Sequence, residues 1–454
     1  MATQKSINPY TQELMQEFEV LNESQINRAI EKSNHTFKSW SQTSFSERTG
    51  LMHKLAEELR ENKSKYARTI SLEMGKVISE STAEIEKCAL VCDYYATEAE
   101  SFLADETLPV DEGEAYLAYD PIGTVLAIMP WNFPFWQVFR FAAPNIMAGN
   151  TGILKHAQNV PQCAKAIEEA FIKVGFPEYV FQSLIIESSQ VNQIIDDWRV
   201  KAVTLTGSEK AGSKVGERAG KNIKKTVLEL GGSDPYLILK DADLEKAAQI
   251  GVKARMINCG QSCIAAKRFI VEASVYDEYL ELYQKNMNEL KFGDPLEQET
   301  DYGAMARNDL AEQLEEQVQG SISKGAELLY GSGKIEREAI FKPSIIGNIK
   351  PDQPAYHEEL FGPAAIFFSV KDENEAISVA NNNPYGLGSA IWTKDIDKAK
   401  IMARSIESGS VFINSMVASN PKTPFGGIKN SGYGRELSFL GIREFMNQKT
   451  IWIK

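Results

Sequence analysis

Residues 124–156 read TVLAIMPWNFPFWQVFRFAAPNIMAGNTGILKH, and the change of pattern within this stretch decides the fold class. The apolar runs Thr124–Met129 and Thr151–Lys155 are short and contain β-branched residues, which predicts two buried strands. Pro130 and Pro134 stiffen the turn that leads from the first strand into a helix. A strand, a helix and a second strand in this order predict a parallel sheet with helices on its faces.

The same alternation continues along the rest of the chain. Helical periodicity, as in Cys163–Val174 and Ala242–Met256, separates further apolar runs. We therefore expect an α/β protein whose ligands bind beyond the carboxyl ends of its strands. The additional strands are expected at Val180–Ile186, Ala202–Thr206, Thr226–Leu228, Tyr236–Leu239, Arg268–Val271, Ala365–Val370, Gly388–Trp392 and Ser410–Asn414.

The first hundred residues are expected to form packing helices. Asn22 or Ser24 can cap one helix, and residues 44–47 (SFSE) have the pattern of a capping box at the start of another. The acidic segment Ala104–Tyr119 then predicts a β-hairpin, and Gln448–Ile453 predicts a terminal strand. Because an isolated hairpin is only marginally stable, these strands are expected either to pair with another subunit or to lie on their own domain.

The composition excludes several classes of function. With 62 acidic and 49 basic side chains among 454 residues, the chain has a net charge of −13, which argues against a nucleic-acid partner. No apolar run approaches the roughly 18–20 residues that cross a bilayer, so no membrane partner is expected. The N-terminal residues carry no visible targeting signal, and the 5 cysteines are sparse and odd in number, so we expect a cytoplasmic protein. No histidine lies near the close cysteine pairs, so no metal site is expected.

A nucleotide site is not marked by the usual signatures. The chain has neither a G-x-G-x-x-G sequence after a strand nor a Walker A sequence. However, residues 206–212 (TGSEKAG) follow a predicted strand and open a helix. The backbone N–H groups there, together with the Ser208 hydroxyl, could hold a pyrophosphate. A turn that binds nothing is the alternative.

Three further clusters contain side chains suited to catalysis. Asn132 stands at the tip of the proline-rich turn, where its amide could donate to an oxyanion. Glu229 lies between two leucines, and a desolvated carboxylate can act as a general base. Cys263 and Cys259 are competing candidates for a nucleophile near a helix end. Each has a plainer alternative: a turn asparagine, a strand-end glutamate bonded to the backbone, or an inert packing cysteine.

Six motifs in a fixed order resemble the NAD(P)-dependent aldehyde dehydrogenase superfamily. They are PWNFP (130–134), TGS (206–208), LELGG (228–232), GQ-x-C (260–263), E-E-x-F-G-P (358–363) and PFGG-x-K-x-SG (424–432). The resemblance runs from about Asn8 to the C-terminus and implies two Rossmann-like parallel-sheet domains with a small β oligomerisation element. The implied boundaries are 1–103 and 120–228 for the NAD(P)-binding domain, 229–437 for the catalytic domain, and 104–119 and 438–454 for the oligomerisation hairpin and C-terminal strand. A homodimer or homotetramer is expected.

The resemblance also implies roles for individual residues. Cys263 would be the nucleophile, Glu229 the general base, and Asn132 with the Cys263 backbone N–H the oxyanion hole. Thiolate attack on an aldehyde, expulsion of hydride to the nicotinamide and hydrolysis of the resulting thioester would follow in that order. The implied contacts with NAD or NADP are Trp131, Lys155, Gln158, Gly207, Ser208, Gly212, Glu359 and Phe361.

Gln158 departs from the pattern of the members that prefer NAD. Those members commonly have a glutamate three residues after the lysine that Lys155 matches, where it binds the ribose 2′-hydroxyl. A carboxylate would repel a 2′-phosphate, whereas the neutral amide of Gln158 would not. We therefore expect NADP to be accepted.

Within the superfamily, four segments are similar to the bacterial short succinate-semialdehyde dehydrogenases: WNFPFWQVFR (131–140), LKHA (154–157), ELGGSDP (229–235) and SGYGREL (431–437). Arg140 matches an arginine that binds the distal carboxylate in the wider semialdehyde group, with a surface salt bridge as the alternative. Ser419 and, more weakly, Arg255 are further candidates for substrate contacts. We expect the oxidation of succinate semialdehyde to succinate.

Four other functions are compatible with parts of the sequence. A broad-specificity enzyme for other aliphatic or aromatic aldehydes is the main alternative, because several aromatic residues follow Asn132. A binding protein without activity is disfavoured, since the three candidate catalytic residues are all present. A cysteine hydrolase would need a histidine base near a catalytic motif, and none of the 4 histidines is adjacent to one. The CoA-acylating branch generally lacks the hydrolytic glutamate that Glu229 matches.

Overall fold

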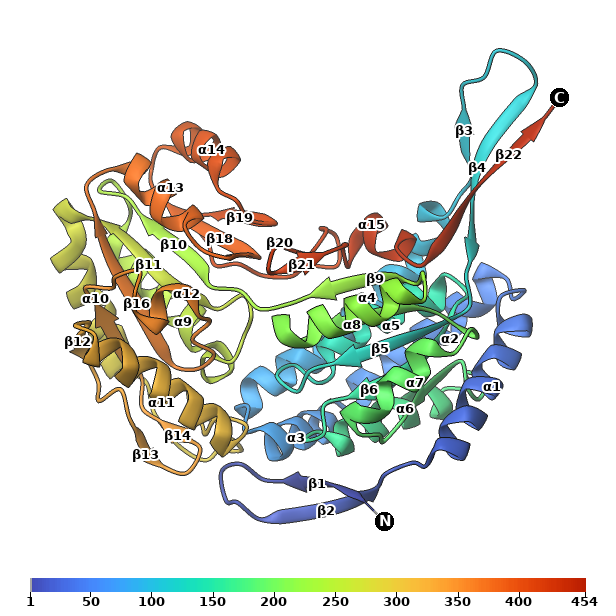
Figure 1. Cartoon of the computed structure of the whole chain (residues 1–454), viewed down its shortest axis with the longest axis horizontal. Helices are drawn as coiled ribbons and strands as arrows, with labels where there is room; N and C mark the ends of the chain where they lie inside the picture. The colour runs from blue at the N-terminus through green and yellow to red at the C-terminus, as the bar shows by residue number, and fades with distance from the viewer. Residues whose placement is uncertain (1) are drawn as a thin grey trace.

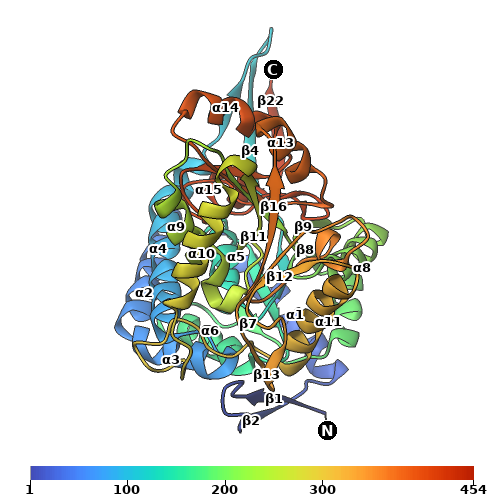
Figure 2. The ribbon, with the colours of Figure 1, turned by 90° about the vertical axis from the view of Figure 1, so that its left-hand side faces the viewer.

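Two large sheets, each covered by helices, make up most of the molecule (Figure 1). The computed structural model describes residues 2–454, apart from the side chain of Arg337. A third, three-stranded sheet projects from one end, and an N-terminal hairpin lies at the opposite end (Figure 2). No helix within residues 2–454 combines the length and the apolar character that a membrane span requires.

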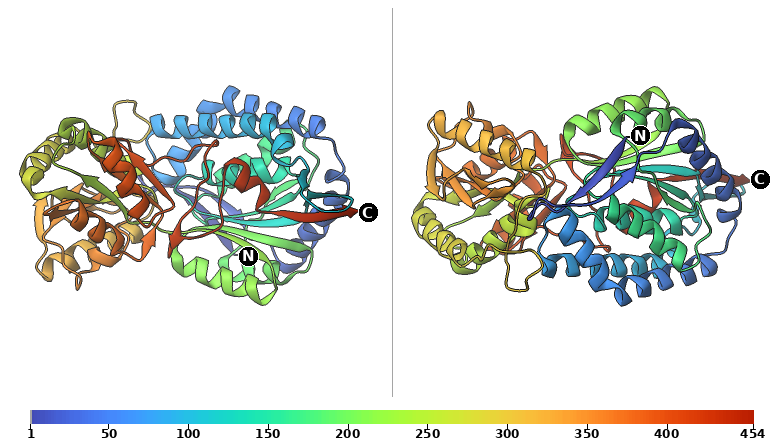
Figure 3. Two further views of the ribbon diagram at one scale, coloured as in Figure 1. Left: turned by 90° about the horizontal axis from the view of Figure 1, so that it is seen from above. Right: turned by 90° about the horizontal axis from the view of Figure 1, so that it is seen from below.

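The first sheet has six strands in the order β21-β9-β8-β5-β6-β7. Its strands are parallel except β21, which pairs antiparallel with β9. Figure 3 shows helices on both faces of this sheet, as the alternating sequence pattern predicts. The bounds are β5 Thr124–Met129, β6 Thr151–His156, β7 Phe181–Ser183, β8 Val200–Thr206, β9 Lys225–Glu229 and β21 Gly432–Tyr433.

Strand β21 corrects one expected boundary. Its residues fall within 229–437, the range expected for the catalytic domain, yet they extend the first sheet through the pair Gly432–Glu229. The C-terminal part of the chain therefore returns to the first sheet before residue 438, and it does so beside Glu229.

The second sheet has seven strands in the order β12-β15-β16-β11-β10-β18-β19. All its pairs are parallel except β12 with β15. The bounds are β10 Asp234–Ile238, β11 Ala266–Glu272, β12 Glu327–Tyr330, β15 Ser344–Gly347, β16 Ala364–Val370, β18 Gly388–Trp392 and β19 Ser410–Ile413. All ten strands expected from the sequence are present, with ends shifted by a few residues. Strands β12 and β15 were not expected, because runs of four residues are too short to show a period.

The small β elements lie outside these two sheets. The projecting sheet has the order β22-β4-β3, which confirms the expected hairpin and terminal strand. The N-terminal pair β1–β2 contradicts the expectation that the first hundred residues are only helical; its strands are largely polar and exposed. The bounds are β1 Thr3–Ile7, β2 Leu14–Glu19, β3 Glu106–Leu108, β4 Glu114–Pro121, β22 Met446–Ile453, β13 Ile335–Arg337, β14 Ile340–Phe341, β17 Tyr385–Gly386 and β20 Ile428–Lys429.

The helices begin largely where capping residues place them. Ser44 forms the predicted capping box at the start of α2. Of the two expected caps for α1, Asn22 is the cap and also forms a capping box, whereas Ser24 lies inside the helix. Each cap contributes about 1 kcal/mol. The bounds are α1 Glu23–Trp40, α2 Phe45–Glu61, α3 Lys63–Met74, α4 Ile78–Phe102, α5 Trp136–Met147, α6 Pro161–Lys173, α7 Val191–Asp196, α8 Glu209–Lys221, α9 Leu244–Met256, α10 Tyr276–Asn288, α11 Asn308–Ser323, α12 Pro354–His357, α13 Glu373–Asn381, α14 Ile396–Ser405 and α15 Ser438–Arg443.

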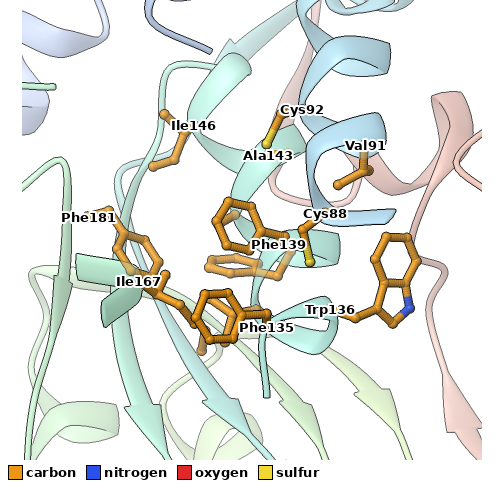
Figure 4. Packing of buried hydrophobic residues seen from close by; sticks show 14 of the residues in the cluster. Cys88, Val91, Cys92, Phe135, Trp136, Phe139, Ala143, Ile146, Ile167 and Phe181 are labelled. Carbon is orange, nitrogen blue, oxygen red and sulfur yellow. The ribbon is translucent and has the colours of Figure 1, made fainter. Parts of the chain in front are cut away.

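An aromatic cluster fixes α5 against α4 and the first sheet (Figure 4). The ring of Phe139 stacks on Phe135 at 6.3 Å, and Cys88 and Cys92 of α4 are fully buried in the same cluster. Burying each large apolar side chain contributes about 1.5–3 kcal/mol. This packing sets the position of the first turn of α5, and therefore of Trp136, relative to α4.

Candidate active site

The carboxyl ends of four parallel strands gather the expected motif residues. Asn132 follows β5, Lys155 lies at the end of β6, Ser208 follows β8, and Glu229 ends β9. Since these strands are parallel and adjacent, their carboxyl ends meet at one edge of the sheet. The chain order reverses between β5 and β8, which is the topological switch point where α/β sheets bind ligands.

Only residues 230–233 connect β9 in the first sheet with β10 in the second. This crossing brings the loop that contains Cys263, just ahead of β11, close to Glu229. A Cβ atom at Gly232 would lie 2.7 Å from the carbonyl oxygen of Cys263, so this position accepts only glycine. The paired glycines of the LELGG motif therefore allow the two sheets to approach at the cysteine loop.

The cysteine loop begins with three consecutive left-handed residues. Asn258 and Cys259 both have φ near +53°, and Gly260 has φ near +74°. Left-handed backbone at residues other than glycine costs on the order of 1 kcal/mol each and persists only when the surroundings hold it. Hydrogen bonds supply that support: the Asn258 N–H donates to Glu80, and its side-chain amide donates to the carbonyl of Asn132.

The structure distinguishes the two competing cysteines. Cys263 is half-buried and lines a cavity, whereas Cys259 is buried and its thiol donates to the Gly303 carbonyl. Asn132 is 3% exposed, and its side-chain amide donates to the Gln261 carbonyl, two residues before Cys263. The amide has a second N–H available. A thiol and a positioned amide donor therefore lie on the same loop junction, as the nucleophile and oxyanion roles require.

Lys267 organises this loop and was missed in the sequence analysis. Its ammonium donates to the carbonyls of Ser262 and Cys263 at 2.7 and 2.9 Å, and it forms an ion pair with Glu359 at 3.1 Å. Burial raises the pKa of the Cys263 thiol to about 12, while the charges of Arg140 and Lys267 act in the opposite direction. Two adjacent basic residues, Lys267 and Arg268, at the start of a predicted buried strand were the signal that could have identified it.

Glu229 is held in a desolvated setting. Its side chain is 2% exposed, and neither carboxylate oxygen has a hydrogen-bond partner among the described residues. Burial raises its pKa well above the usual range, the nearby Glu436 raises it further, and Arg140 counteracts both. A Cβ atom at Gly426 would lie 2.7 Å from the Glu229 carboxylate. A protonatable carboxyl with free oxygens has the chemistry of a general base.

A cavity of about 800 Å³ opens in front of Cys263. Its walls come from α4, the start of α5, α9 and the segment 416–425. Its lining includes the aromatic side chains Phe133, Trp136 and Phe425, the cations Lys87, Arg140 and Lys253, and the hydroxyl of Ser419.

Of the three residues expected to contact the substrate, two line the cavity and the third does not. Arg140 and Ser419 both line the cavity. Arg140 is 2% exposed, forms an ion pair with Glu436 and lies over the ring of Phe425, so its ion pair is buried rather than on the surface. The substrate contact expected for Arg255 is corrected: this side chain is 0% exposed, lies outside the cavity wall and donates to the Gly260 carbonyl. It supports the cysteine loop.

The expected cofactor residues surround the same sheet edge. Lys155 is 6% exposed, burial lowers its pKa to about 8, and its ammonium forms no ion pair or hydrogen bond within the described part of the chain. A ligand with phosphate or hydroxyl oxygens would satisfy this ammonium, which fits a dinucleotide. Gly207 and Ser208 lead into α8, and the Ser208 hydroxyl accepts from the Ala211 N–H. Gln158 is exposed just beyond β6.

Three of the four remaining cofactor candidates, Trp131, Glu359 and Phe361, lie where the two halves of the molecule meet. The rings of Trp131 and Phe361 meet edge to face at 5.8 Å, next to the Lys267–Glu359 ion pair. Gly212 lies in α8 and packs closely against the side chain of Leu230, which follows β9. Trp131, Phe361 and Glu359 thus bring both halves of the molecule to one place.

Comparisons with known proteins identify the family of the chain. The chain is 47% identical over 449 residues to a probable succinate-semialdehyde dehydrogenase [NADP(+)] of Synechocystis sp., covering 99% of both chains. It is 45% identical to succinate-semialdehyde dehydrogenase [NADP(+)] 1 of Mycobacterium tuberculosis, again with 99% of each covered. Its fold matches the crystal structure of succinic semialdehyde dehydrogenase from Streptococcus pyogenes in complex with NADP+, with a TM-score of 0.97, 40% identity and 99% coverage of each chain. The model of the aldehyde dehydrogenase family matches residues 2–451, and the chain therefore belongs to that family.

Proposed function

We propose that this enzyme oxidises succinate semialdehyde to succinate and uses NADP, with NAD as a second acceptor. Aldehyde, water and oxidised cofactor would give the carboxylate, the reduced cofactor and two protons. The observation that carries this proposal is a single cavity with the thiol of Cys263 in one wall and the cations Lys87 and Arg140 in another. The names of the relatives described above point to the same substrate.

The first chemical step uses the cysteine loop. The Cys263 thiolate attacks the aldehyde carbon and forms a tetrahedral hemithioacetal. The second N–H of the Asn132 amide and the backbone N–H of Cys263 donate to the oxyanion that develops. Neighbouring positive charge from Arg140 and Lys267 favours the thiolate against the effect of burial. When bound, the nicotinamide of the cofactor supplies the oxidising power by accepting a hydride from that carbon.

Hydrolysis of the resulting thioester needs a base. Glu229 is buried, unpartnered and raised in pKa, so it can take a proton from water and release the acid. Lys155, Ser208 and Gln158 would hold the adenosine half of the cofactor, and Glu359 with Phe361 the nicotinamide half. Because Gln158 is neutral and exposed, it leaves space for a 2′-phosphate without charge repulsion.

A broad-specificity aldehyde dehydrogenase is the second candidate. The observation that favours it is the aromatic character of the cavity wall, to which Phe133, Trp136 and Phe425 contribute. Initial rates with succinate semialdehyde, glutarate semialdehyde, butanal and benzaldehyde, each with NAD and with NADP, separate the two. A clear preference in kcat/KM for succinate semialdehyde with NADP supports the first candidate. Equal or higher values for butanal or benzaldehyde support the second.

We also propose a homodimer or homotetramer in the cytoplasm. The projecting sheet ends in β3 and β22, whose outer edges have no partner strand among the described elements and could pair with another subunit. All 5 cysteines are free thiols, as suits a reducing compartment. Light scattering of the purified protein would give the number of subunits.

A further inference from the structure

Lys267 lies behind the cysteine loop, on the side away from the cavity. It is the second residue of β11, its side chain is 0% exposed, and it does not line the cavity. Its ammonium contacts the carboxylate of Glu359 and two consecutive backbone carbonyls, those of Ser262 and Cys263. An ammonium group has three N–H donors, and these three acceptors use all of them. Any effect of Lys267 on a substrate must therefore pass through the cysteine loop.

The peptide unit between Ser262 and Cys263 links Lys267 to the reaction site. The Ser262 carbonyl, 2.7 Å from the Lys267 ammonium, shares this unit with the N–H of Cys263. A trans peptide unit is planar, and its C=O and N–H bonds point in opposite directions. None of the peptide bonds described for residues 2–454 is cis. Because Lys267 holds the carbonyl on its own side, the Cys263 N–H points to the opposite side, where it donates to no other group of residues 2–454.

The charge of Lys267 also strengthens this N–H as a donor. Hydrogen bonds in a chain polarise one another, because a cation at the carbonyl oxygen withdraws electron density from the whole amide. The low dielectric of a buried site increases the effect. Burial lowers the pKa of Lys267, and the carboxylate of Glu359 acts in the opposite direction. Glu359 thus helps to keep the ammonium charged behind the loop.

Arg268 is the next residue of β11 and provides an internal comparison. Its side chain is also 0% exposed, and its guanidinium also donates to backbone carbonyls. However, these carbonyls belong to Val379 and Asn382, at 2.9 and 3.5 Å, and not to the cysteine loop. Successive side chains of a strand point to opposite faces, which explains why two adjacent buried cations have separate partners.

We propose that Lys267 is a positioning residue of the oxyanion hole, which orients the Cys263 N–H through the Ser262 carbonyl and strengthens it as a donor. The effect is largest when the thiolate forms its bond to the aldehyde carbon, because the electron pair of the C=O bond then moves onto the oxygen. This inference rests on the proposed function in one respect, that Cys263 is the nucleophile. It does not depend on which aldehyde is oxidised.

Two reactions of the same thiol test this role. Oxidation of an aldehyde passes through an oxyanion, whereas alkylation by iodoacetamide displaces iodide and forms none. Both reactions need the thiolate, so a change in the pKa of Cys263 alters both rates alike. The first turnover is measured by rapid mixing with succinate semialdehyde and with butanal, and alkylation by mass spectrometry of the Cys263 peptide. Both are measured at one pH with saturating NADP.

Lys267→Met should slow the first turnover by about 10- to 150-fold more than it slows alkylation, the equivalent of a charge-assisted hydrogen bond of about 1.5–3 kcal/mol. Both aldehydes should be affected alike. The control Arg268→Met removes a buried cation from the same strand and should keep the wild-type ratio of the two rates. If Lys267→Met does not fold because Glu359 is left unpaired, the double variant Lys267→Met/Glu359→Gln tests the same ratio, since it contains no unpaired carboxylate.

Equal slowing of both reactions would show that Lys267 acts only on the thiolate, and would overturn the proposal. A rise in the KM for NADP with an unchanged first turnover would also overturn it, because Lys267 would then act only through Glu359. So would an equal change of the ratio in Arg268→Met. Failure of the proposed function gives different results: a wild-type enzyme that prefers butanal changes the substrate but not this ratio, and activity that survives in Cys263→Ala removes the nucleophile itself.

Discussion

The side-chain amide of Asn132 donates a hydrogen bond to the backbone carbonyl of Gln261, 3.1 Å away. This contact joins the turn after β5, in the first sheet, to the cysteine loop that precedes β11, in the second. The amide of Asn258 reinforces the junction, because it donates to the carbonyls of both residues. The donor and the thiol proposed for the reaction are thus held by the same junction, and pre-organised donors of this kind are worth about 10²–10³ in kcat.

Replacement of the two cysteines should have opposite consequences. Cys263→Ala should abolish NADP-linked aldehyde oxidation, because it removes the thiol that lines the cavity. Cys259→Ala should keep most of the activity, because that thiol is buried and bonded to a backbone carbonyl. Steady-state rates with succinate semialdehyde, and circular dichroism as a check on folding, measure both. Activity that survives in Cys263→Ala but not in Cys259→Ala would reverse the assignment.

Glu229→Gln should separate the two halves of the reaction. The amide cannot take a proton from water, so acylation should continue while deacylation stalls. Rapid mixing should then show a burst of reduced cofactor of about one per active site, followed by turnover that is slower by about 10²–10⁴. Glu229→Asp provides the comparison in which a carboxylate is kept at a shorter reach. Steady-state turnover equal to the wild type in Glu229→Gln would exclude an essential base at this position.

Gln158→Glu should change the choice of cofactor. A carboxylate there would face the 2′-phosphate, and at an effective dielectric of about 20 and roughly 4 Å the repulsion is a few kcal/mol per unit charge. The KM for NADP should therefore rise far more than the KM for NAD. Gln158→Asn is the neutral control. If both values of KM changed by the same factor in Gln158→Glu, residue 158 would not face the ribose.

Arg140→Ala should impair oxidation of both acidic and neutral aldehydes. The change leaves Glu436 buried without its cation, which costs about 3–5 kcal/mol in typical buried pairs. It also removes a positive charge that lowers the pKa of both Cys263 and Glu229. Thermal denaturation and kcat/KM for succinate semialdehyde and butanal check this together. A loss of activity confined to succinate semialdehyde, with unchanged thermal stability, would instead show that Arg140 binds the distal carboxylate of the substrate.

The preference for acidic aldehydes should depend on pH. Lys87 has a pKa of about 8, lowered first by burial and then by the charge of Arg140, with Lys76 acting in the same direction and Glu84 against it. A lysine is half charged at its pKa, so the preference should be full well below pH 8, fall to about half near pH 8 and be lost above it. The ratio of kcat/KM for succinate semialdehyde to that for butanal measures this, because titration of the thiol affects both substrates alike. A ratio that stays constant from pH 6.5 to pH 9.5, a range chosen to span roughly 1.5 units on either side of the pKa, would show that the charge of Lys87 does not contribute to the preference.

Local patterns in the sequence were sufficient for much of the fold. The strands β5, β8 and β18 were located because their apolar runs have a period that differs from that of the helices between them. Ser44 was recognisable as a cap because a capping box involves only residues three positions apart, and Asn22 was one of the two caps expected for α1. The polar hairpin β1–β2 has no such signal, and it was missed.

The candidate catalytic residues were also visible in the sequence, since each belongs to a contiguous motif, but their partners were not. Cys263 could be separated from Cys259 by its place in GQ-x-C, while Arg255 was given a substrate contact although it is buried beneath the loop.

Only the tertiary structure decided which charges are free. Arg140 is paired with Glu436, and Lys87 meets Ser419 across 332 positions of sequence. Whether a charged side chain is already paired depends on the groups that pack against it. For Arg140 and Lys87, this packing is determined by how α4, α5 and the C-terminal segment meet. The sequence by itself therefore determined ten strands of the two large sheets, the helix caps and the reactive groups, because these depend on neighbours along the chain. Which basic side chain lacks a carboxylate partner, and can therefore bind a substrate, depends on neighbours in space. Only the folded chain brings those neighbours together.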